Sequence, residues 1–457
     1  MQSVKTKSII LAAGQGTRMK SSTSKVLHEI FHKPLVYYPI EAARYAGAQE
    51  VCLVVGHKSE EVMKTFGDTV KYALQAERLG TGHAVMQAMD FIRDDGEILV
   101  LYGDTPLITA QTIEKMLAFH RKKKNAVTVL SALVDDPTGY GRIVRDESKH
   151  FVKIVEQKDA TDEEKRITEI NGGMYVFEAK HLKSALSKIT NNNKQQEYYL
   201  TDTIEILLHE GYNVDAIAIM NPDDILGVNS REQLAQATAI MKQRINRKHM
   251  DNGVTLIDPH HTYIDPEVEI GQDTVIEPGC IIEGNTSIGE NCIIGYNTKI
   301  RNCTVGNSVA IESSMLIDSQ IDEGCHIGPF AYIRPNSHIG AKVKIGDFVE
   351  IKNATIGEGT KVSHLTYIGD ADVGCDVNFG CGTVVVNYDG EKKHRTTIKD
   401  HAFIGCNTNL VSPVVIEENV YTAAGSTITQ DVPKNSLAIA RARQEIKPEW
   451  VTKKRQK

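Results

Sequence analysis

The sequence predicts two folds in one chain: an α/β domain in the first half and a β-solenoid in the second. Two observations carry this prediction. Short apolar runs alternate with helix-like stretches over residues 1–229, and isoleucine recurs at every sixth position over residues 264–300 and again over 327–351. The length of 457 residues agrees, because it exceeds what one ordinary hydrophobic core supports.

The first half reads as strands and helices in alternation. The runs KSIILAAG, VCLVVG, EILVLYGD and AVTVLSAL each stop at glycine, aspartate or a polar residue, and stretches such as HKPLVYYPIEAARYAGA lie between them. Strands that alternate with helices are typical of an α/β domain with a mostly parallel sheet. We therefore assign residues 1–229 to such a domain.

A connecting helix is predicted over residues 230–250. Ser230 followed by Gln233 has the spacing of a capping box, which marks a helix start. Apolar residues then follow at helical spacing, namely Leu234, Ala237, Met241 and Ile245. This stripe is interpreted as local core.

The second half, residues 251–457, repeats with a period of six. Isoleucine stands at 264, 270, 276, 282, 288, 294 and 300, and the spacing resumes from Ile327 to Ile351. One deep apolar residue per six suits a triangular solenoid with one short strand per face, roughly 18 residues per coil. Successive coils should stack about 4.8 Å apart.

Two segments depart from this repeat. NYDGEKKHRTTIKD, residues 387–400, is polar, basic and rich in turn residues, which predicts a loop that protrudes from a coil. The C-terminal tail, KNSLAIARARQEIKPEWVTKKRQK, also leaves the repeat, and we expect its end to be mobile.

Composition narrows the class of partner. The net charge of −7 argues against a nucleic-acid or acidic-membrane partner, so we expect small-molecule substrates. No apolar stretch has membrane-spanning length, and the N-terminal apolar run of about five residues is shorter than a signal-peptide core, which predicts a cytoplasmic protein. The eight cysteines form no C-x-x-C pair and are interpreted as small buried apolar residues.

The stretch IILAAGQGTRMKSSTSKVL, residues 9–27, points to a phosphate. A strand ends at Gly14 and Gly16, and the cations Arg18 and Lys25 follow. Glycines let backbone N–H groups approach an anion closely, and the cations add charge. The spacing matches neither the P-loop nor the dinucleotide fingerprint. A tight turn with incidental cations is the alternative.

Further motifs follow in order: LQAERLGTGHAV, LYGDTPL, DPTGYGRIV, VEQKDA, NGGMYVF and LGVN. Together with the solenoid, they resemble the family of bifunctional bacterial N-acetylglucosamine-1-phosphate uridyltransferases/glucosamine-1-phosphate N-acetyltransferases over essentially the whole chain. One departure is Ser24 before Lys25, where many relatives have proline. The resemblance implies a Rossmann-like nucleotidyltransferase domain, a left-handed parallel β-helix and a homotrimer. Its product would be UDP-N-acetylglucosamine, a precursor of peptidoglycan and lipopolysaccharide.

In the implied uridylyl transfer, a sugar 1-phosphate attacks the α-phosphate of UTP. The nucleophile is already an anion, so positioning and charge neutralisation do the work and no general base is needed. The resemblance gives Arg18 and Lys25 the role of stabilising the triphosphate, and makes Asp104 and Asn229 ligands of Mg²⁺. An aspartate after a strand is otherwise most often a turn or helix cap.

The resemblance implies a larger set of residues around UTP and UDP-N-acetylglucosamine. Gln75, Gly80 and Thr81 would read uracil, and Gly141, Glu156 and Asn171 would hold the sugar. The remaining members are Leu11, Ala12, Ala13, Gly14, Lys25 and Asn229.

Arg334 and Lys352 are one coil apart, so the repeat stacks two cations on one corner. These cations could form a solvated basic row on the surface, or they could bind a sugar phosphate. The resemblance favours the sugar phosphate. It implies that Tyr367 and Asn378 complete the glucosamine-1-phosphate pocket. His364 matches the base that deprotonates the amine, although an isolated histidine is more often structural.

The acetyl donor site is implied in the same way. The residues matched to acetyl-CoA are Cys381, Asn387, Tyr388, Cys406, Ala424 and Arg441, and some relatives have serine in place of Cys406. Thiol alkylation is therefore expected to inhibit acetyl transfer more than uridylyl transfer.

Two rival functions predict different sets of residues. A monofunctional sugar-phosphate nucleotidyltransferase with a structural solenoid predicts no acetyl-site constellation, yet Arg334, Lys352 and His364 are all present. A scaffold protein with an inactive head predicts loss of Lys25 or Asp104, and neither is lost. The sequence favours an enzyme that acetylates glucosamine 1-phosphate and then transfers UMP.

Overall fold

The computed structural model describes residues 4–193 and 195–455 and divides into two compact units between Met241 and Lys242. The division falls inside helix α7 (Arg231–Asp251), within the segment predicted as a connecting helix. In the described part of the chain, no helix is long and apolar enough to cross a membrane.

A mixed sheet forms the centre of the first unit, with the strand order β11-β7-β10-β6-β1-β4-β5. Strand β10 is antiparallel to both its neighbours, and the other six run in one direction. The hairpin of β8 (Arg142–Arg145) and β9 (Phe151–Val155) attaches to β10. The main strands are β1 (Thr6–Ala12), β4 (Glu50–Val55), β5 (Lys71–Leu74), β6 (Glu97–Tyr102), β7 (Val127–Leu133), β10 (Glu169–Glu178) and β11 (Val214–Ile219).

Helices cover both faces of this sheet, because its strands are apolar on both sides. In β1, Ile9 and Leu11 join one core cluster, while Ile10 and Ala12 join the other. The first cluster includes residues of α3 (Thr81–Met86), α5 (Ala179–Leu186) and α6 (Asp202–His209). The second includes residues of α1 (Tyr37–Tyr45), α2 (Ser59–Phe66) and α4 (Ala110–Lys123). The predicted α/β class is confirmed.

The start of α7 carries the predicted cap. The Gln233 backbone N–H donates to the Ser230 hydroxyl at 3.2 Å. The Gln233 side-chain oxygen accepts from the Asn229 backbone N–H at 2.8 Å, one residue earlier than in a regular capping box. Leu234, Ala237 and Met241 then pack on a small cluster with Ile30, Leu35 and Leu107.

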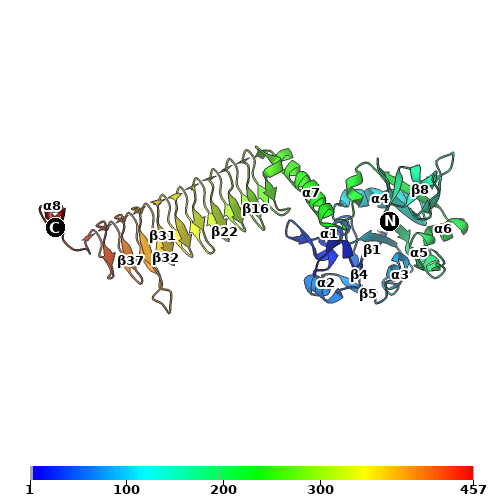
Figure 1. Cartoon of the computed structure of the whole chain (residues 1–457), viewed down its shortest axis with the longest axis horizontal. Coiled ribbons are helices and arrows are strands. Elements are labelled where there is room, and N and C mark those ends of the chain that lie inside the picture. Colours follow the sequence, from blue (N-terminus) through cyan, green and yellow to red (C-terminus); the bar gives the residue numbers. More distant parts are fainter. Residues whose placement is uncertain (1–3, 194, 456–457) are drawn as a thin grey trace. The chain divides into compact units, whose positions relative to one another are not determined.

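The second unit is a solenoid of three parallel sheets with 11, 10 and 9 strands (Figure 1). Each coil contributes one strand to each sheet, so β13 (Tyr263–Ile264) pairs with β16 (Ile281–Glu283) and Ile264 lies opposite Ile282. The repeat slips because some coils are shorter: Ile300 pairs with Leu316, sixteen positions later. The predicted β-solenoid is confirmed.

The strands that carry the predicted acetyl site belong to two of these sheets. One sheet contains β27 (Lys344–Asp347), β30 (Lys361–His364), β33 (Asn378–Phe379), β36 (Phe403–Ile404) and β39 (Tyr421–Thr422). The next contains β25 (Tyr332–Ile333), β28 (Glu350–Lys352), β31 (Tyr367–Gly369), β34 (Val384–Val386) and β37 (Asn409–Val411).

The two departures from the repeat are shorter than the sequence suggested. Strand β35 (Thr396–Ile398) takes the chain back into the coil, so the protruding loop spans residues 387–395 rather than 387–400 (Figure 1). Its last residue, Arg395, pairs with Asp372 at 2.5 Å. Strand β41 (Leu437–Ala438) still pairs with β39, so the tail leaves the solenoid later than predicted, before α8 (Trp450–Arg455).

Candidate functional sites

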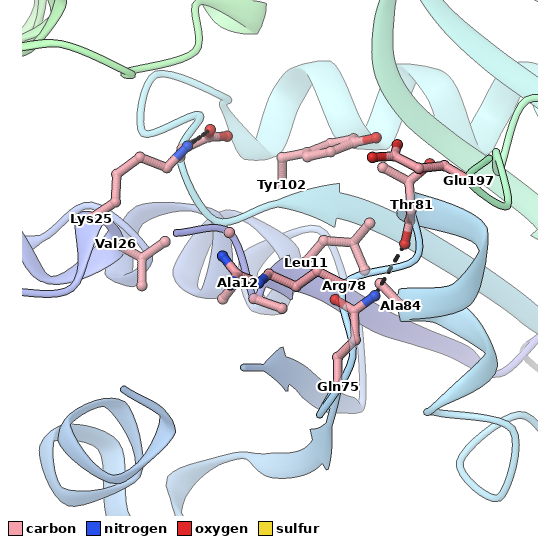
Figure 2. A pocket seen from close by; sticks show the side chains of 14 residues that line it. Leu11, Ala12, Lys25, Val26, Gln75, Arg78, Thr81, Ala84, Tyr102 and Glu197 are labelled. Atoms are coloured by element: carbon pink, nitrogen blue, oxygen red, sulfur yellow. Dashed lines mark hydrogen bonds and ion pairs between the residues drawn. The ribbon is translucent and has the colours of Figure 1, made fainter. Parts of the chain in front are cut away.

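A cavity of about 290 Å³ opens at the carboxyl edge of the first unit's parallel strands (Figure 2). Figure 2 shows Lys25 on one side of it and Thr81 with Glu197 on the other. Open α/β sheets bind ligands at this edge. Predicted residues that line the cavity are Leu11, Ala12, Ala13, Gly14, Lys25, Gln75, Gly80, Thr81 and Asp104, joined by the unpredicted Val26, Arg78, Ala84, Tyr102 and Glu197.

The two glycines after β1 have different tasks. A Cβ on Gly14 would meet nothing within 4 Å, so its backbone faces open space beside the cavity. Gly16 has φ +62°, and a Cβ there would lie 2.5 Å from the Lys25 Cβ. Glycine at this position therefore lets Lys25 pack against the turn.

Lys25 brings the predicted metal ligands together. Its ammonium nitrogen contacts the Asp104 carboxylate and lies 3.0 Å from the Asn229 side-chain oxygen. Two oxygens from distant segments thus converge on one cation position, which fits a hard cation such as Mg²⁺. The Val228 backbone N–H donates to the Asp104 carbonyl at 2.8 Å and holds the two segments side by side.

Hydrogen bonds hold the predicted uracil-reading residues Gln75, Gly80 and Thr81 in place. The Gln75 side chain is buried, and its amide nitrogen donates to the Gly80 carbonyl at 3.1 Å. Gly80 has φ +106°, and a Cβ there would lie 2.5 Å from the Tyr198 carbonyl. The Leu200 backbone N–H donates to the Thr81 hydroxyl at 3.1 Å, which holds the Thr81 side chain in place.

The predicted sugar residues also lie together. A Cβ on Gly141 would be 3.5 Å from both the Asn171 Cβ and a Glu156 carboxylate oxygen. Burial raises the pKa of Glu156, and the nearby Asp159 raises it further. Burial likewise raises the pKa of Tyr102 far above its usual range, with added contributions from Asp104 and Glu156. Tyr102 thus lies near both carboxylates as a neutral hydroxyl.

Arg18 is separate from this group. It is an exposed residue of the 3-10 turn Thr17–Met19 and does not line the cavity. Besides Lys25, the cation that lines the cavity is Arg78, whose guanidinium donates to the Gln15 side chain at 2.6 Å. Sequence reasoning missed Arg78 and Tyr102; the position of Tyr102 at the end of the strand run EILVLYGD was the available signal.

In the solenoid, Arg334 and Lys352 occupy neighbouring coils as the repeat predicted, because Ile333 pairs with Ile351. Arg334 pairs with Glu350 at 2.5 Å. The pKa of Lys352 is lowered, first by Lys393, then by desolvation and by Arg334. Lys393 comes from the loop 387–395, so three cations gather here rather than two. The basic run EKKHR was the signal for the third.

His364 has a carboxylate partner that sequence reasoning missed. Its Nδ1 lies 2.6 Å from the Asp347 carboxylate, one coil away in the same sheet. This hydrogen bond holds the pKa of Asp347 below its usual range. Because Nδ1 is occupied, the exposed imidazole presents Nε2 for proton transfer. The one-coil separation of the two residues was the signal.

Asn387 is held at the root of the loop. Its amide nitrogen donates to the buried Asp370 at 2.5 Å and lies 3.5 Å from the Tyr367 hydroxyl. The other Asp370 oxygen accepts from Asn353 at 2.5 Å. Asp370, also missed, therefore fixes the direction of the Asn387 side chain. The neighbouring Tyr388 is exposed.

Four predicted acetyl-CoA residues share one corner of the solenoid. Phe379 pairs with Ile404, so Cys381 and Cys406 follow at equivalent positions of consecutive coils. The Gly425 backbone N–H donates to the Cys406 carbonyl at 2.8 Å, which sets Ala424 on the next coil. Arg441 lies beside the same corner, since a Cβ on Gly425 would be 3.8 Å from its Cδ.

One expectation, that the cysteines are buried, needs correction. Cys406 and Cys375 are exposed and Cys381 is half-buried, so only Cys52, Cys280, Cys292, Cys303 and Cys325 are the buried residues that composition suggested. Asn378 lies on β33, in a different sheet from Arg334, Lys352 and Tyr367, and its place in the sugar-phosphate pocket stays a prediction.

Two family models match the chain. Residues 7–225 match the nucleotidyl transferase model, and residues 267–302, 318–353 and 395–430 match the bacterial transferase hexapeptide model of six repeats. The first match covers the unit with the cavity, and the second covers the solenoid.

Relatives match over nearly the full length. "Bifunctional protein GlmU" of Acetivibrio thermocellus is 56% identical over 98% of this chain and 97% of its own. The protein of that name from Caldanaerobacter subterraneus is 56% identical over 97% of both chains, and the one from Alkaliphilus metalliredigens is 53% identical over 99% of both. Among solved structures, a Bacillus anthracis chain described as a glucose-1-phosphate thymidylyltransferase matches at 20% identity and a TM-score of 0.43, over 51% of this chain and 94% of its own, too weakly to carry an argument.

Proposed function

The chain belongs to the GlmU family of bifunctional transferases, and from this premise we propose which of its residues carry each reaction. The enzyme acetylates glucosamine 1-phosphate with acetyl-CoA. It then transfers UMP from UTP to N-acetylglucosamine 1-phosphate, which yields UDP-N-acetylglucosamine and pyrophosphate. The observation that supports our assignment most is the presence of two separate polar constellations, one in each unit: Lys25 with Asp104 and Asn229, and His364 with Asp347.

For uridylyl transfer, we assign binding and positioning to the cavity of the first unit. Asp104 and Asn229 would hold Mg²⁺, which neutralises phosphate charge when bound. The Gly14 turn and Lys25 bind the triphosphate, with Arg18 as a further cation. Uracil is recognised by Gln75, Gly80 and Thr81. The sugar is held by Gly141, Glu156 and Asn171. The sugar phosphate oxygen attacks the α-phosphorus as pyrophosphate leaves, so the chain supplies no base.

For acetyl transfer, Arg334, Lys352 and Lys393 bind the sugar phosphate, with Tyr367 and Asn378 beside it. His364 Nε2 takes a proton from the amine as nitrogen attacks the thioester carbonyl. Asp347 holds Nδ1 and stabilises the imidazolium that forms. Coenzyme A leaves as a thiolate and is protonated. Asn387 orients the amine, and the remaining donor-site residues are Cys381, Tyr388, Cys406, Ala424 and Arg441.

We further propose that the solenoids assemble as a homotrimer that completes this site. Phe330, Phe348 and Leu365 stand on one corner of three consecutive coils with 59%, 58% and 57% of their surface exposed. The first two rings stack at 5.6 Å, and all three residues have positive φ, which is unfavourable for bulky side chains. A partner solenoid would cover this ladder. Light scattering should give three chains per particle, and Phe348→Asp should give fewer.

The substrates also favour a location. UTP and acetyl-CoA are made and used in the cytoplasm, and we propose that the enzyme acts there on small molecules alone. No nucleic acid or membrane enters either proposed reaction.

One assay tests the two assignments together. Purified protein receives glucosamine 1-phosphate, acetyl-CoA, UTP and Mg²⁺, while free thiol and pyrophosphate are followed in the same sample. Thiol release should precede pyrophosphate, and omission of UTP should leave N-acetylglucosamine 1-phosphate to accumulate. Pyrophosphate that forms only from added N-acetylglucosamine 1-phosphate, with no thiol release, would remove His364 from the proposed role.

A further inference from the structure

We propose that Cys381 and Cys406 form a dithiol pair that is oxidised to an intrachain disulfide by low-molecular-weight disulfides, and that this modification blocks acetyl transfer. The blocking effect rests on the proposed acetyl site; the formation of the disulfide does not. The argument uses the register of the solenoid, the exposure of the two thiols and their place next to His364.

The register places the two cysteines side by side. Asn378 pairs with Phe403, and Phe379 pairs with Ile404. Cys381 and Cys406 each follow two residues after the second pair, so they occupy equivalent positions of consecutive coils. Backbone bonds hold both sides of the pair: the Gly380 N–H donates to the Ile404 carbonyl at 2.7 Å, and the Asn407 N–H donates to the Cys381 carbonyl at 2.8 Å. Neighbouring strands are about 4.8 Å apart, inside the range of Cα separations that disulfides span.

The side chains also leave the backbone in the same direction. Each cysteine precedes a residue with positive φ, Gly382 at 76° and Asn407 at 54°, so the two turns have the same form. Parallel Cβ atoms on neighbouring coils lie slightly further apart than the roughly 3.8 Å typical of a disulfide. Closing the bond therefore requires a shift of about 1 Å at a surface corner, with no change of strand pairing.

Access separates these two thiols from most of the others. Cys406 is exposed and Cys381 half-buried, whereas burial raises the pKa of Cys280, Cys303 and Cys325 to about 11 and keeps them as inert thiols. The third accessible thiol, Cys375, has no cysteine beside it. Its backbone N–H donates to the Asp400 carboxylate at 2.8 Å, on the coil where a partner would have to stand.

The pair lies in line with the proposed base. Asp347 pairs with His364, and Val362 pairs with Phe379, so His364 and Cys381 fall at matching positions of consecutive coils. Asp347, His364, Cys381, Cys406 and Ala424 thus follow one another along a single corner, about 4.8 Å per step. A disulfide formed here changes the surface between the base and the acetyl donor.

The chemistry balances as thiol–disulfide exchange. The Cys406 thiolate attacks a small disulfide RSSR, which gives a mixed disulfide and one RS⁻. The Cys381 thiolate then attacks the Cys406 sulfur and releases the second RS⁻. The two protons lost by the cysteines end on the two RSH molecules, and the protein loses two electrons to RSSR.

The test treats the full-length enzyme with oxidised glutathione, blocks free thiols with iodoacetamide, and maps peptides by mass. We expect a linked Cys381–Cys406 peptide, a loss of acetyl transfer of tenfold or more that dithiothreitol reverses, and unchanged uridylyl transfer. Cys381→Ser should stop at one glutathione on Cys406. Cys375→Ser, the matched control, should behave like wild type. Each variant is compared with its own reduced form.

Two glutathiones without a link, or a link that involves Cys375 or joins two chains, would overturn the dithiol proposal. A linked peptide with unchanged acetyl transfer would leave the dithiol in place and refute the location of the acetyl donor beside it. Failure of the proposed function is therefore distinguishable from failure of the pair.

Discussion

The two proposed sites differ in how much of each lies within one folded unit. In the first unit, Lys25 and Gln75 are buried, and oxygens of Asp104 and Asn229 already converge on the Lys25 ammonium. In the solenoid, the His364 side chain is 59% exposed and Asn378 belongs to another sheet than Arg334. A cavity inside a unit is preorganised by its own core, whereas a site on a surface corner needs a partner to exclude water. This difference predicts that each activity can be removed without the other.

The largest expected effect comes from replacing His364, the proposed base of the acetyl site in the solenoid. His364→Ala should lower the rate of acetyl transfer by roughly 10²- to 10⁴-fold, the usual contribution of a general base. Uridylyl transfer from added N-acetylglucosamine 1-phosphate should not change. The control is His338→Ala, a second solenoid histidine, which pairs with Asp322 at 2.9 Å. Acetyl transfer that survives His364→Ala, or that fails equally in the control, would refute the assignment.

Asp104→Ala should affect the other activity, uridylyl transfer in the cavity of the first unit. Loss of this carboxylate should lower uridylyl transfer by roughly 10²-fold, because it removes a proposed ligand of the Mg²⁺ that neutralises phosphate charge. Added Mg²⁺ should restore part of the rate if Asp104 is a ligand, and acetyl transfer should remain. Asp94→Ala, which removes an exposed ion pair with Lys183, serves as the control. A rate of uridylyl transfer that does not depend on Mg²⁺ in either the wild type or Asp104→Ala would contradict the metal assignment.

A smaller effect should follow from Gly16→Ala, on the order of tenfold on uridylyl transfer. The new Cβ would meet the Lys25 side chain at 2.5 Å and move it from Asp104. Gly47→Ala separates backbone strain from this contact, because Gly47 also has positive φ, +98°, but has no neighbour within 4 Å. We expect Gly47→Ala to lower thermal stability without changing either rate. Equal kinetic losses in both variants would mean that strain, not Lys25, is responsible.

The smallest effect concerns stability rather than rate. Burial lowers the pKa of His120 to about 4, against 6.5 when unfolded, so between these pH values the unfolded state binds the extra proton. Stability is therefore lost as pH falls through 6.5, by about 2 kcal/mol between pH 7 and pH 5. Hydrogen exchange of amides in α4 and β7 measures this change. His120→Gln should reduce it, and the exposed His209→Gln should not.

Sequence reasoning performed well where a pattern repeats. The six-residue spacing predicted the solenoid and the one-coil relation of Arg334 and Lys352, because each coil has the same path as the last. The strand-to-glycine ending predicted a phosphate-binding turn, and Gly14 of this turn lines the cavity, because local sequence determines local backbone. The cap of α7 follows from Ser230 and Gln233 alone.

Partners supplied from elsewhere in the chain were missed. Asp347, Asp370 and Lys393 each act on a predicted residue from another coil or from the loop. Tyr102 and Arg78 reach the cavity from different strands and turns. Such contacts depend on three-dimensional register, and a single sequence carries no local signal for it. The exposed thiols were misjudged because composition does not distinguish an inner position of the coil from an outer one.

The stacked coils of the second unit have a further consequence for how this half of the chain unfolds. Each coil touches only the coils before and after it, so stability is nearly a sum of nearest-neighbour terms and the ends fray first. Ala424 stands one coil from β41, the last strand of the stack. The carboxyl-terminal coils that would carry the acetyl donor should therefore open while coils in the middle of the stack, such as those around Ile311, stay closed. A protease that cuts only opened chain would shorten the solenoid from the donor end inwards, and acetyl transfer would be lost before the stack itself.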